Sequence, residues 1–285
     1  MKRLEEYLIG KNAPDAAEKS RIMLAFMALV LEKNESINLT SIKEPELFIE
    51  KHLIDSSACY GWPEIEEAEI IADMGTGAGF PGVPLAILYP EKDFTLIDSL
   101  GKRTEFLKEA LPEIGIKNIR LIKSRAEDAG RDEVLREKFD LCLSRAVGNL
   151  SVLSEYCLPL IKPGAFFYAW KTEGAASEIE ESLQARLLLG AGPEVIVRPF
   201  IKYDKTKHDK TDTEDSNINA NELTESIDAT KSTDQVREAI STESTESELS
   251  AGKNIYQHNM IIIQKERHTP DTYPRRAGVP SRVPL

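Results

Sequence analysis

The sequence has no long hydrophobic run. Its longest apolar run, residues 22–31, has ten residues, whereas a membrane-spanning helix needs about 20. No basic leader followed by an apolar segment and a small-residue cleavage site opens the chain either. These absences predict a cytoplasmic protein that does not bind a membrane.

Cysteine is scarce, with three residues in a chain of 285. Cys59, Cys142 and Cys157 are scattered and lack the paired spacing of a zinc site or a redox motif. Free cysteine commonly behaves as a small buried apolar residue. We therefore expect three buried free thiols and no metal ion.

Basic residues are outnumbered by acidic residues, 36 to 48, which gives a formal net charge of −12. Such a total argues at first against a nucleic-acid partner. The charge is unevenly distributed, however. Residues 204–250 hold thirteen acidic and five basic residues, a net charge of −8, whereas residues 265–285 carry +3. Local basic patches are therefore a better guide to partners than the total.

The acidic segment, residues 203–253, is expected to be disordered. Residues 204–250 contain fifteen Ser and Thr and no aromatic residue, so they cannot bury enough apolar surface to offset the entropy of ordering. Weak helix is expected only around residues 234–240. Because loop-closure entropy grows slowly with length, a long insertion between two paired strands is tolerable.

The rest of the chain divides into an N-terminal helical layer, a core and a tail. Residues 1–66 are expected to hold helices at 14–34 and 46–58, from their helical apolar spacing. In the core, residues 67–265, strands and helices alternate, which predicts an α/β fold with a parallel sheet. The strands are expected at 69–74, 93–98, 118–123, 139–144 and 165–171, and the helices at 82–89, 101–113, 126–137, 149–159 and 173–188. Residues 194–201 and 255–264 follow as an antiparallel pair, and residues 266–285 form a basic, proline-rich tail.

A glycine-rich loop follows the first expected strand. Gly77, Gly79 and Gly82 match the G-x-G-x-x-G fingerprint of dinucleotide-binding proteins, with Gly75 directly after the strand. No Gly-Lys-Ser/Thr follows, which excludes a P-loop. The loop alone is therefore compatible with a nicotinamide-dependent oxidoreductase or with a non-catalytic protein that senses a nucleotide.

Two acidic residues change this interpretation. Asp73 stands just before the glycines and Asp98 closes the second strand, so the pattern resembles the S-adenosylmethionine site of Rossmann-like methyltransferases. Bare glycine backbone at Gly75 and Gly77 would admit the cofactor, and Asp98 could accept hydrogen bonds from both ribose hydroxyls. The alternative role for Asp98 is to cap the helix that begins near Ser99.

Several longer motifs are similar to those of one family. They occupy residues 38–42, 52–56, 73–87, 96–103, 143–146 and 273–280 and resemble the bacterial small-subunit ribosomal RNA methyltransferase G family, also called glucose-inhibited division protein B. The resemblance covers nearly the whole chain outside residues 203–253. It implies a class I, Rossmann-like methyltransferase that uses S-adenosylmethionine to methylate N7 of one guanine in the 16S rRNA of the small ribosomal subunit, and a monomer is expected.

The resemblance also implies site residues. Cofactor contacts fall on Gly75, Phe80, Ala126, Glu127 and Arg145. Arg145 would also be catalytic by orienting the guanine through O6, the edge that arginine reads in DNA; its alternative role is a surface ion pair. His52, which lies among charged and apolar residues in the sequence, is expected to be structural.

RNA is expected to contact basic clusters rather than single residues. One cluster surrounds the cofactor side of the sheet, and the tail adds a mobile basic strip. Their members are Lys102, Arg103, Arg120, Lys123 and Arg125, and in the tail Arg275, Arg276 and Arg282.

Overall fold

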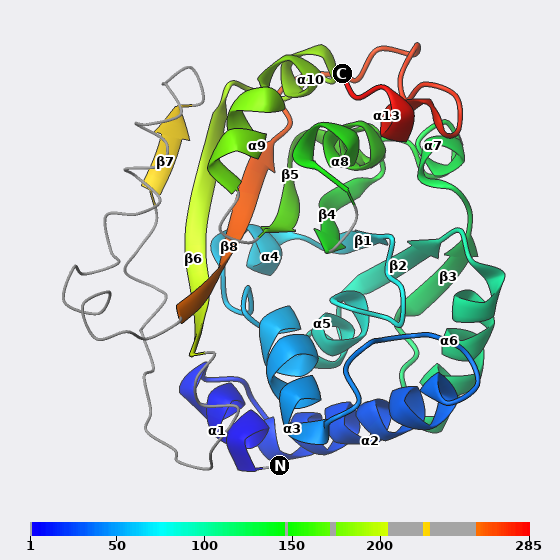
Figure 1. Cartoon of the computed structure of the whole chain (residues 1–285), viewed down its shortest axis with the longest axis vertical. Helices are drawn as coiled ribbons and strands as arrows, with labels where there is room; N and C mark the ends of the chain where they lie inside the picture. Colours follow the sequence, from blue (N-terminus) through cyan, green and yellow to red (C-terminus); the bar gives the residue numbers. More distant parts are fainter. Residues whose placement is uncertain (1, 146–147, 172–174, 205–224, 229–254) are drawn as a thin grey trace.

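The computed structural model describes residues 2–145, 148–171, 175–204, 225–228 and 255–285 (Figure 1). Their strands form one eight-stranded sheet in the order β3-β2-β1-β4-β5-β8-β6-β7. The strands are β1 Ile70–Met74, β2 Asp93–Asp98, β3 Ile119–Lys123, β4 Phe139–Arg145, β5 Ile161–Lys171, β6 Glu194–Asp204, β7 Glu225–Asp228 and β8 Ile255–Gln264.

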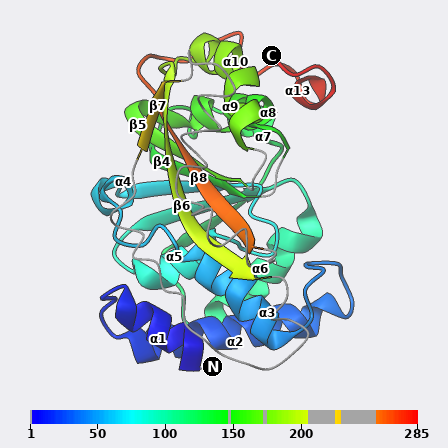
Figure 2. The same ribbon diagram turned by 60° about the vertical axis from the view of Figure 1, so that its left-hand side comes forward.

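The sheet is parallel over its first five strands and antiparallel beyond them. β1 pairs in parallel with β2 and β4, β2 with β3, and β4 with β5. β8 then pairs antiparallel with β5 and β6, and the long β6 and β8 cross one side of the molecule together (Figure 2). The predicted α/β fold with a parallel sheet and an antiparallel terminal pair is confirmed. The carboxyl ends of β1 to β4 share one edge, where ligands bind in open sheets of this kind.

Helices cover both faces of the sheet. The N-terminal part contributes α1 Lys2–Gly10, α2 Ala16–Asn34, α3 Pro45–Phe48, a π-helical turn at Ile49–Ile54 and α4 Pro63–Glu67. The helices that alternate with the strands are α5 Gly82–Leu88, α6 Gly101–Glu113, α7 Ala126–Ala129, α8 Leu150–Cys157, α9 Ala175–Glu181 and α10 Leu183–Leu188, and the chain ends with α13 Val279–Arg282.

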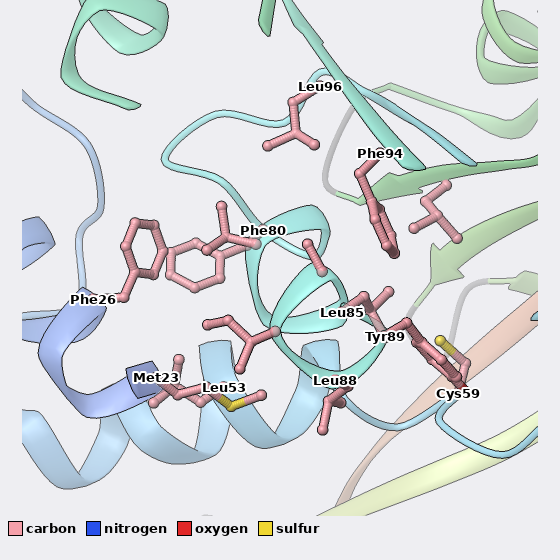
Figure 3. Packing of buried hydrophobic residues seen from close by; sticks show 14 of the residues in the cluster. Met23, Phe26, Leu53, Cys59, Phe80, Leu85, Leu88, Tyr89, Phe94 and Leu96 are labelled. Atoms are coloured by element: carbon pink, nitrogen blue, oxygen red, sulfur yellow. The ribbon is translucent and has the colours of Figure 1, made fainter. Parts of the chain in front are cut away.

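The N-terminal helical layer shares its hydrophobic core with the sheet. Met23 and Phe26 of α2 and Leu53 of the π-helical turn are fully buried against Phe80 and the helix α5 that follows the glycine loop (Figure 3). Along each strand, successive side chains point to opposite faces of the sheet. The helical layer therefore reaches the sheet beside the glycine loop and forms one wall of the region around it.

Some expected boundaries are wrong. The helix predicted over residues 126–137 ends at Ala129, because Gly130 follows and the chain then turns at Asp132, whose side chain accepts a hydrogen bond from Val134 N. α1 and α4 were not predicted. Within the segment expected to be disordered, β7 pairs with β6. Residues 205–224 and 229–254 of that segment, with the helix expected at 234–240, lie outside the described residues.

The C-terminal tail is packed on the core, and the expectation of a mobile basic strip is wrong. The guanidinium of Arg136 donates to the carbonyl oxygens of Thr269 and Tyr273. Arg275 forms an ion pair with Glu155 of α8. The tail thereby brings α13 beside α7 and α8, in the upper part of the views in Figures 1 and 2.

The three cysteines are buried and free, as predicted. Within the described residues, no helix has both the length and the apolar character needed to cross a membrane. The same residues contain no group of three or more histidine, cysteine or acidic side chains that could hold a metal ion.

Candidate functional site

The glycine loop is fixed against the end of β2. The backbone N–H groups of Gly75 and Thr76 both donate to the carbonyl oxygen of Ile97, at 2.8 and 3.2 Å. Gly75 and Gly77 have φ angles of 74° and 62°, which residues with a Cβ rarely adopt. The loop therefore presents bare backbone at the carboxyl edge of the sheet, where a nucleotide can approach it closely.

Asp73 ties the two ends of this loop together. Its Oδ2 accepts hydrogen bonds from Thr76 Oγ1 at 2.6 Å and from Gly82 N at 2.9 Å. Its Oδ1 is buried and has no hydrogen-bond partner among the described residues. Burial raises the pKa of Asp73 to about 6. A buried carboxylate with one unused oxygen is suited to a cationic ligand group, because pairing would offset the cost of burying its charge.

Asp98 is not the N-cap of α6, which is Leu100, but it contacts the segment just before that helix. Its Oδ1 accepts from Leu100 N at 2.8 Å at the start of α6, and its Oδ2 accepts from Gly77 N at 2.9 Å and from Arg103 at 3.3 Å. The carboxylate thus joins the glycine loop to α6. A carboxylate offers about four acceptor positions. Ribose hydroxyls bound to Asp98 would therefore share its carboxylate with the glycine loop and α6.

Phe80 turns its side chain into the core. The ring is 5% exposed, stacks on His52 with 4.7 Å between ring centroids, and packs against Phe26 and Phe48. The ring of Phe80 is therefore part of the hydrophobic core between the glycine loop and the helical layer. The Phe80 backbone N–H donates to the carbonyl oxygen of Thr76 at 2.9 Å, within the glycine loop.

Arg145 is held by the helical layer. One terminal nitrogen donates to Asp55 Oδ2 at 2.8 Å and to the carbonyl oxygen of Lys51 at 3.0 Å, and the other contacts His52 Nδ1 at 2.9 Å. The ion pair is not on the surface, because the side chains of Arg145 and Asp55 are 14% and 1% exposed. The guanidinium also lies over the ring of Phe80. The end of β4 is thereby joined to the π-helical turn.

Asp55 and His258 are parts of this arrangement that the sequence analysis missed. Burial alone would raise the pKa of Asp55, but its hydrogen bond with His258 and the charge of Arg145 hold the pKa below its ordinary value. His52 is structural, as expected: burial and the Arg145 charge lower its pKa to about 3, and its Nε2 pairs with Thr40 Oγ1. Asp55 stands in the motif at 52–56, and a carboxylate beside buried apolar residues was the available signal.

Ala126 and Glu127 open α7 directly after β3. Glu127 is 5% exposed, and its Oε1 accepts a hydrogen bond from Gly278 N at 2.6 Å. The two residues follow β3 at the carboxyl edge where Asp98 ends the neighbouring β2. The structure thus places the expected residues of the loop, β2 and α7 along one edge of the sheet.

A cavity of about 380 Å³ lies beside this edge. It is lined by residues 36–39 on one side and by residues 100–103, including Lys102 and Arg103, on the other. The 36–39 wall is held by Asn34, whose Oδ1 accepts from the backbone N–H groups of Leu39 and Thr40. Lys102 and Arg103, which are expected to contact RNA, therefore line this cavity together with the exposed apolar residue Leu100.

The other basic residues are placed differently. Arg120, Lys123 and Arg125 are exposed along the edge strand β3 and just after it. Arg276 is exposed, whereas Arg275 turns inward to Glu155. The expected cluster around β3 and α6 is thus on the surface, and Arg275 is engaged in the protein.

The fold and the site define the protein as a Rossmann-like class I methyltransferase. The family described as rRNA small subunit methyltransferase G matches residues 19–200. Proteins named ribosomal RNA small subunit methyltransferase G are 36% identical in Clostridium tetani, over 94% of this chain and 91% of that protein, and 35% identical in Clostridium beijerinckii, over 98% of both. The chain belongs to the rRNA small subunit methyltransferase G family, which confirms the resemblance seen in the sequence.

Solved structures resemble the chain more distantly. An O-methyltransferase from Thermotoga maritima is 11% identical, with a TM-score of 0.46 over 84% of this chain and 72% of that one. A precorrin-6y C5,15-methyltransferase from Geobacter metallireducens is 13% identical, with a TM-score of 0.43 over 81% and 93%. The family membership favours neither the oxidoreductase nor the nucleotide sensor.

Proposed function

We propose that this enzyme transfers a methyl group from S-adenosylmethionine to N7 of one guanine in the 16S rRNA of the small ribosomal subunit. The observation that carries the proposal is the glycine loop, closed by Asp73 and Asp98 at the carboxyl edge of the sheet, in a chain of the rRNA small subunit methyltransferase G family. We expect the enzyme to act in the cytoplasm, where ribosomes are assembled, and to be a monomer.

The residues present fit S-adenosylmethionine. Gly75 and Gly77 offer bare backbone, and the unused oxygen of Asp73 is an acceptor for a cationic group such as an ammonium. Asp98 would hold the ribose, and Ala126 and Glu127 would hold the adenine. When bound, this cofactor supplies a methyl group on a positively charged sulfur.

The proposed acceptor requires no general base. Guanine N7 has an exposed lone pair and no proton, so the protein has to align the reactants and stabilise the displaced charge. Arg145 suits the positioning of guanine. A guanidinium has five N–H donors, and the described contacts use three of them, so O6 can be bound without releasing Asp55. His52, with its pKa of about 3, is held neutral and structural.

The activity is tested with labelled S-adenosylmethionine and small ribosomal subunits from cells that lack the enzyme. The label is then mapped by cleavage specific for N7-methylguanine in the extracted RNA. We expect label at one guanine of 16S rRNA. Label on protein or on a small molecule, or no label, would overturn the proposal.

If the basic cluster contacts RNA phosphates, substitution of Lys102 should change the affinity for the small subunit and its salt dependence. This residue is exposed at the cavity between residues 36–39 and 100–103. Lys102→Ala is expected to weaken subunit binding severalfold and to lower the salt dependence of binding by about one counterion. Affinity is measured at several salt concentrations, and the affinity for S-adenosylmethionine should not change.

Lys138→Ala provides the matched control. Lys138 is also an exposed lysine, but it lies just before β4 and hence at the amino edge of the sheet. Its removal should leave subunit affinity and salt dependence as in the unmodified protein. An equal loss in both variants would show that Lys102 acts only through net charge and would contradict its assignment to the RNA surface.

A further inference from the structure

The helix α7, which carries Glu127, is too short to hold its own position. It has four residues, and an isolated helix needs about 12–15 residues to be even marginally stable in water. Gly130 ends it, and residues 130–137 continue without regular helix. The orientation of Glu127 therefore depends on the segments that pack against α7 and the turn after it.

The C-terminal residues 269–285, here called the C-terminal strap, supply these contacts. Arg136 donates to the carbonyl oxygens of Thr269 and Tyr273, and Arg131 donates to that of Pro274 at 2.8 Å. A Cβ on Gly130 would stand 2.9 Å from Pro274 Cγ, so the strap lies directly against the turn. Figures 1 and 2 both show the end of the chain beside α7 and α8.

An ion pair with a buried carboxylate anchors the strap. Arg275 donates from its backbone N–H and its guanidinium to Glu155 of α8, at 2.6 to 3.1 Å. The Glu155 side chain is 1% exposed. Charge-assisted bonds of this kind are stronger and more directional than neutral ones. This anchor fixes the position of the next few residues of the strap.

Three residues further on, the strap reaches the candidate site. Gly278 N donates to Glu127 Oε1 at 2.6 Å. Gly278 has a φ of 78°, a conformation that directs this N–H and that residues with a Cβ rarely adopt. The hydrogen bond joins the last residues of the chain to the acidic side chain at the carboxyl edge of β3.

We infer that the C-terminal strap is part of the cofactor site and that Gly278 is a positioning residue, which holds the Glu127 carboxylate for the adenine end of S-adenosylmethionine. The inference rests on the proposed function. Glu127 would accept a hydrogen bond from the adenine amino group, and a carboxylate already held by the hydrogen bond from Gly278 N loses less entropy when it binds. It also assigns Arg275 to the anchoring of the strap instead of to RNA.

The inference is tested with Gly278→Pro, which removes the N–H donor and cannot adopt the required φ. Gly115→Pro is the matched control, because Gly115 has a φ of 76° and also donates a backbone hydrogen bond, but is exposed at the end of α6 with no atom within 4 Å of its Cβ position. Dissociation constants of S-adenosylmethionine and S-adenosylhomocysteine are measured by calorimetry, together with thermal midpoints and the turnover number at saturating cofactor.

Gly278→Pro is expected to weaken both ligands by the same factor, about tenfold for one charge-assisted hydrogen bond, because both carry adenosine. Turnover at saturating cofactor should stay within about twofold, and Gly115→Pro should keep the cofactor affinity of the unmodified protein despite a lower thermal midpoint. Unchanged cofactor affinity in Gly278→Pro, or an equal loss in Gly115→Pro, would overturn the inference.

A measurement on the unmodified protein avoids dependence on the folding of a variant. Saturating S-adenosylmethionine should slow amide hydrogen exchange in residues 126–131 and in residues 276–283 together. Slower exchange in residues 126–131 alone would overturn the role of the strap and leave the proposed function intact. Failure of the unmodified protein to bind S-adenosylmethionine would instead overturn the proposed function.

Discussion

Arg145→Ala is expected to lower the free energy of unfolding by about 3–5 kcal/mol and to remove most methyl transfer to the small subunit. The stability loss follows because the substitution removes the arginine partner of Asp55, whose side chain is 1% exposed, and leaves its charge beside His258. Removing one partner of a buried ion pair is costly. The activity loss follows because the proposed contact to guanine O6 disappears with the guanidinium. Denaturant unfolding and the labelled-subunit assay measure the two effects.

A second buried pair separates stability from activity. Arg198 of β6 and Glu64 of α4 are each 9% exposed and form a bidentate pair at 2.7 and 2.8 Å. Arg198→Ala should lower stability by a similar amount but leave the turnover number near that of the unmodified protein under conditions where both variants are folded. If Arg145→Ala, once folded, kept both S-adenosylmethionine affinity and turnover, Arg145 would be structural only.

The double variant Arg145→Met with Asp55→Val sharpens this distinction. Replacing both members of a buried ion pair by apolar residues is often close to neutral in stability. We therefore expect the double variant to recover part of the stability lost in Arg145→Ala, while methyl transfer stays low. Recovery of activity together with stability would contradict a contact between Arg145 and the guanine.

Local pattern was sufficient where an element is defined by its own residues. The strand at 93–98 and the helix at 101–113 have the predicted bounds. An apolar strand and a helix with regular apolar spacing can each be recognised from a short stretch of sequence. The glycine loop and its two acidic residues were recognised for the same reason. The edge at which they meet follows from the parallel sheet alone.

Contacts between distant residues were beyond such patterns. Asp55 and Arg145 are 90 residues apart in the sequence, and Glu155 and Arg275 are 120 apart. Neither pairing has a local signature, so Arg275 looked like an RNA-binding residue in a basic tail. Gly130 shows the same limit. The sequence could indicate that a helix ends there, but it could not indicate that the C-terminal strap packs against this glycine.

Asp73 leads to the second prediction, on the pH dependence of cofactor binding. Burial raises its pKa from 3.8 to about 6, with a smaller contribution from the charge of Asp98, whereas Arg145 and the hydrogen bonds from Thr76 and Gly82 act in the opposite direction. Because the folded-state pKa is the higher one, this group contributes less to folding stability as the pH rises from about 4 to about 6. Asp73 is therefore mostly ionised above about pH 6, and a cationic ligand would offset the free-energy cost of burying its charge.

The affinity for S-adenosylmethionine should consequently increase as the pH rises through about 6 and reach a plateau above about 7. At about pH 5 only about one Asp73 in eleven is ionised, so binding should be about tenfold weaker than at about pH 7. Asp73→Asn cannot ionise, and it should bind at least tenfold more weakly at about pH 7 with a flat pH profile over this range. Equilibrium dialysis at several pH values measures both proteins.

Asp93→Asn is the control for charge alone. Asp93 is exposed at the amino end of β2, at the edge of the sheet opposite to the glycine loop, so its substitution should leave both the affinity and its pH profile unchanged. A flat profile in the unmodified protein would show that the cofactor does not use the Asp73 charge. In that case the carboxylate would serve only to close the loop through Thr76 and Gly82, and Asp73→Asn would act through loop geometry rather than through attraction of the ligand.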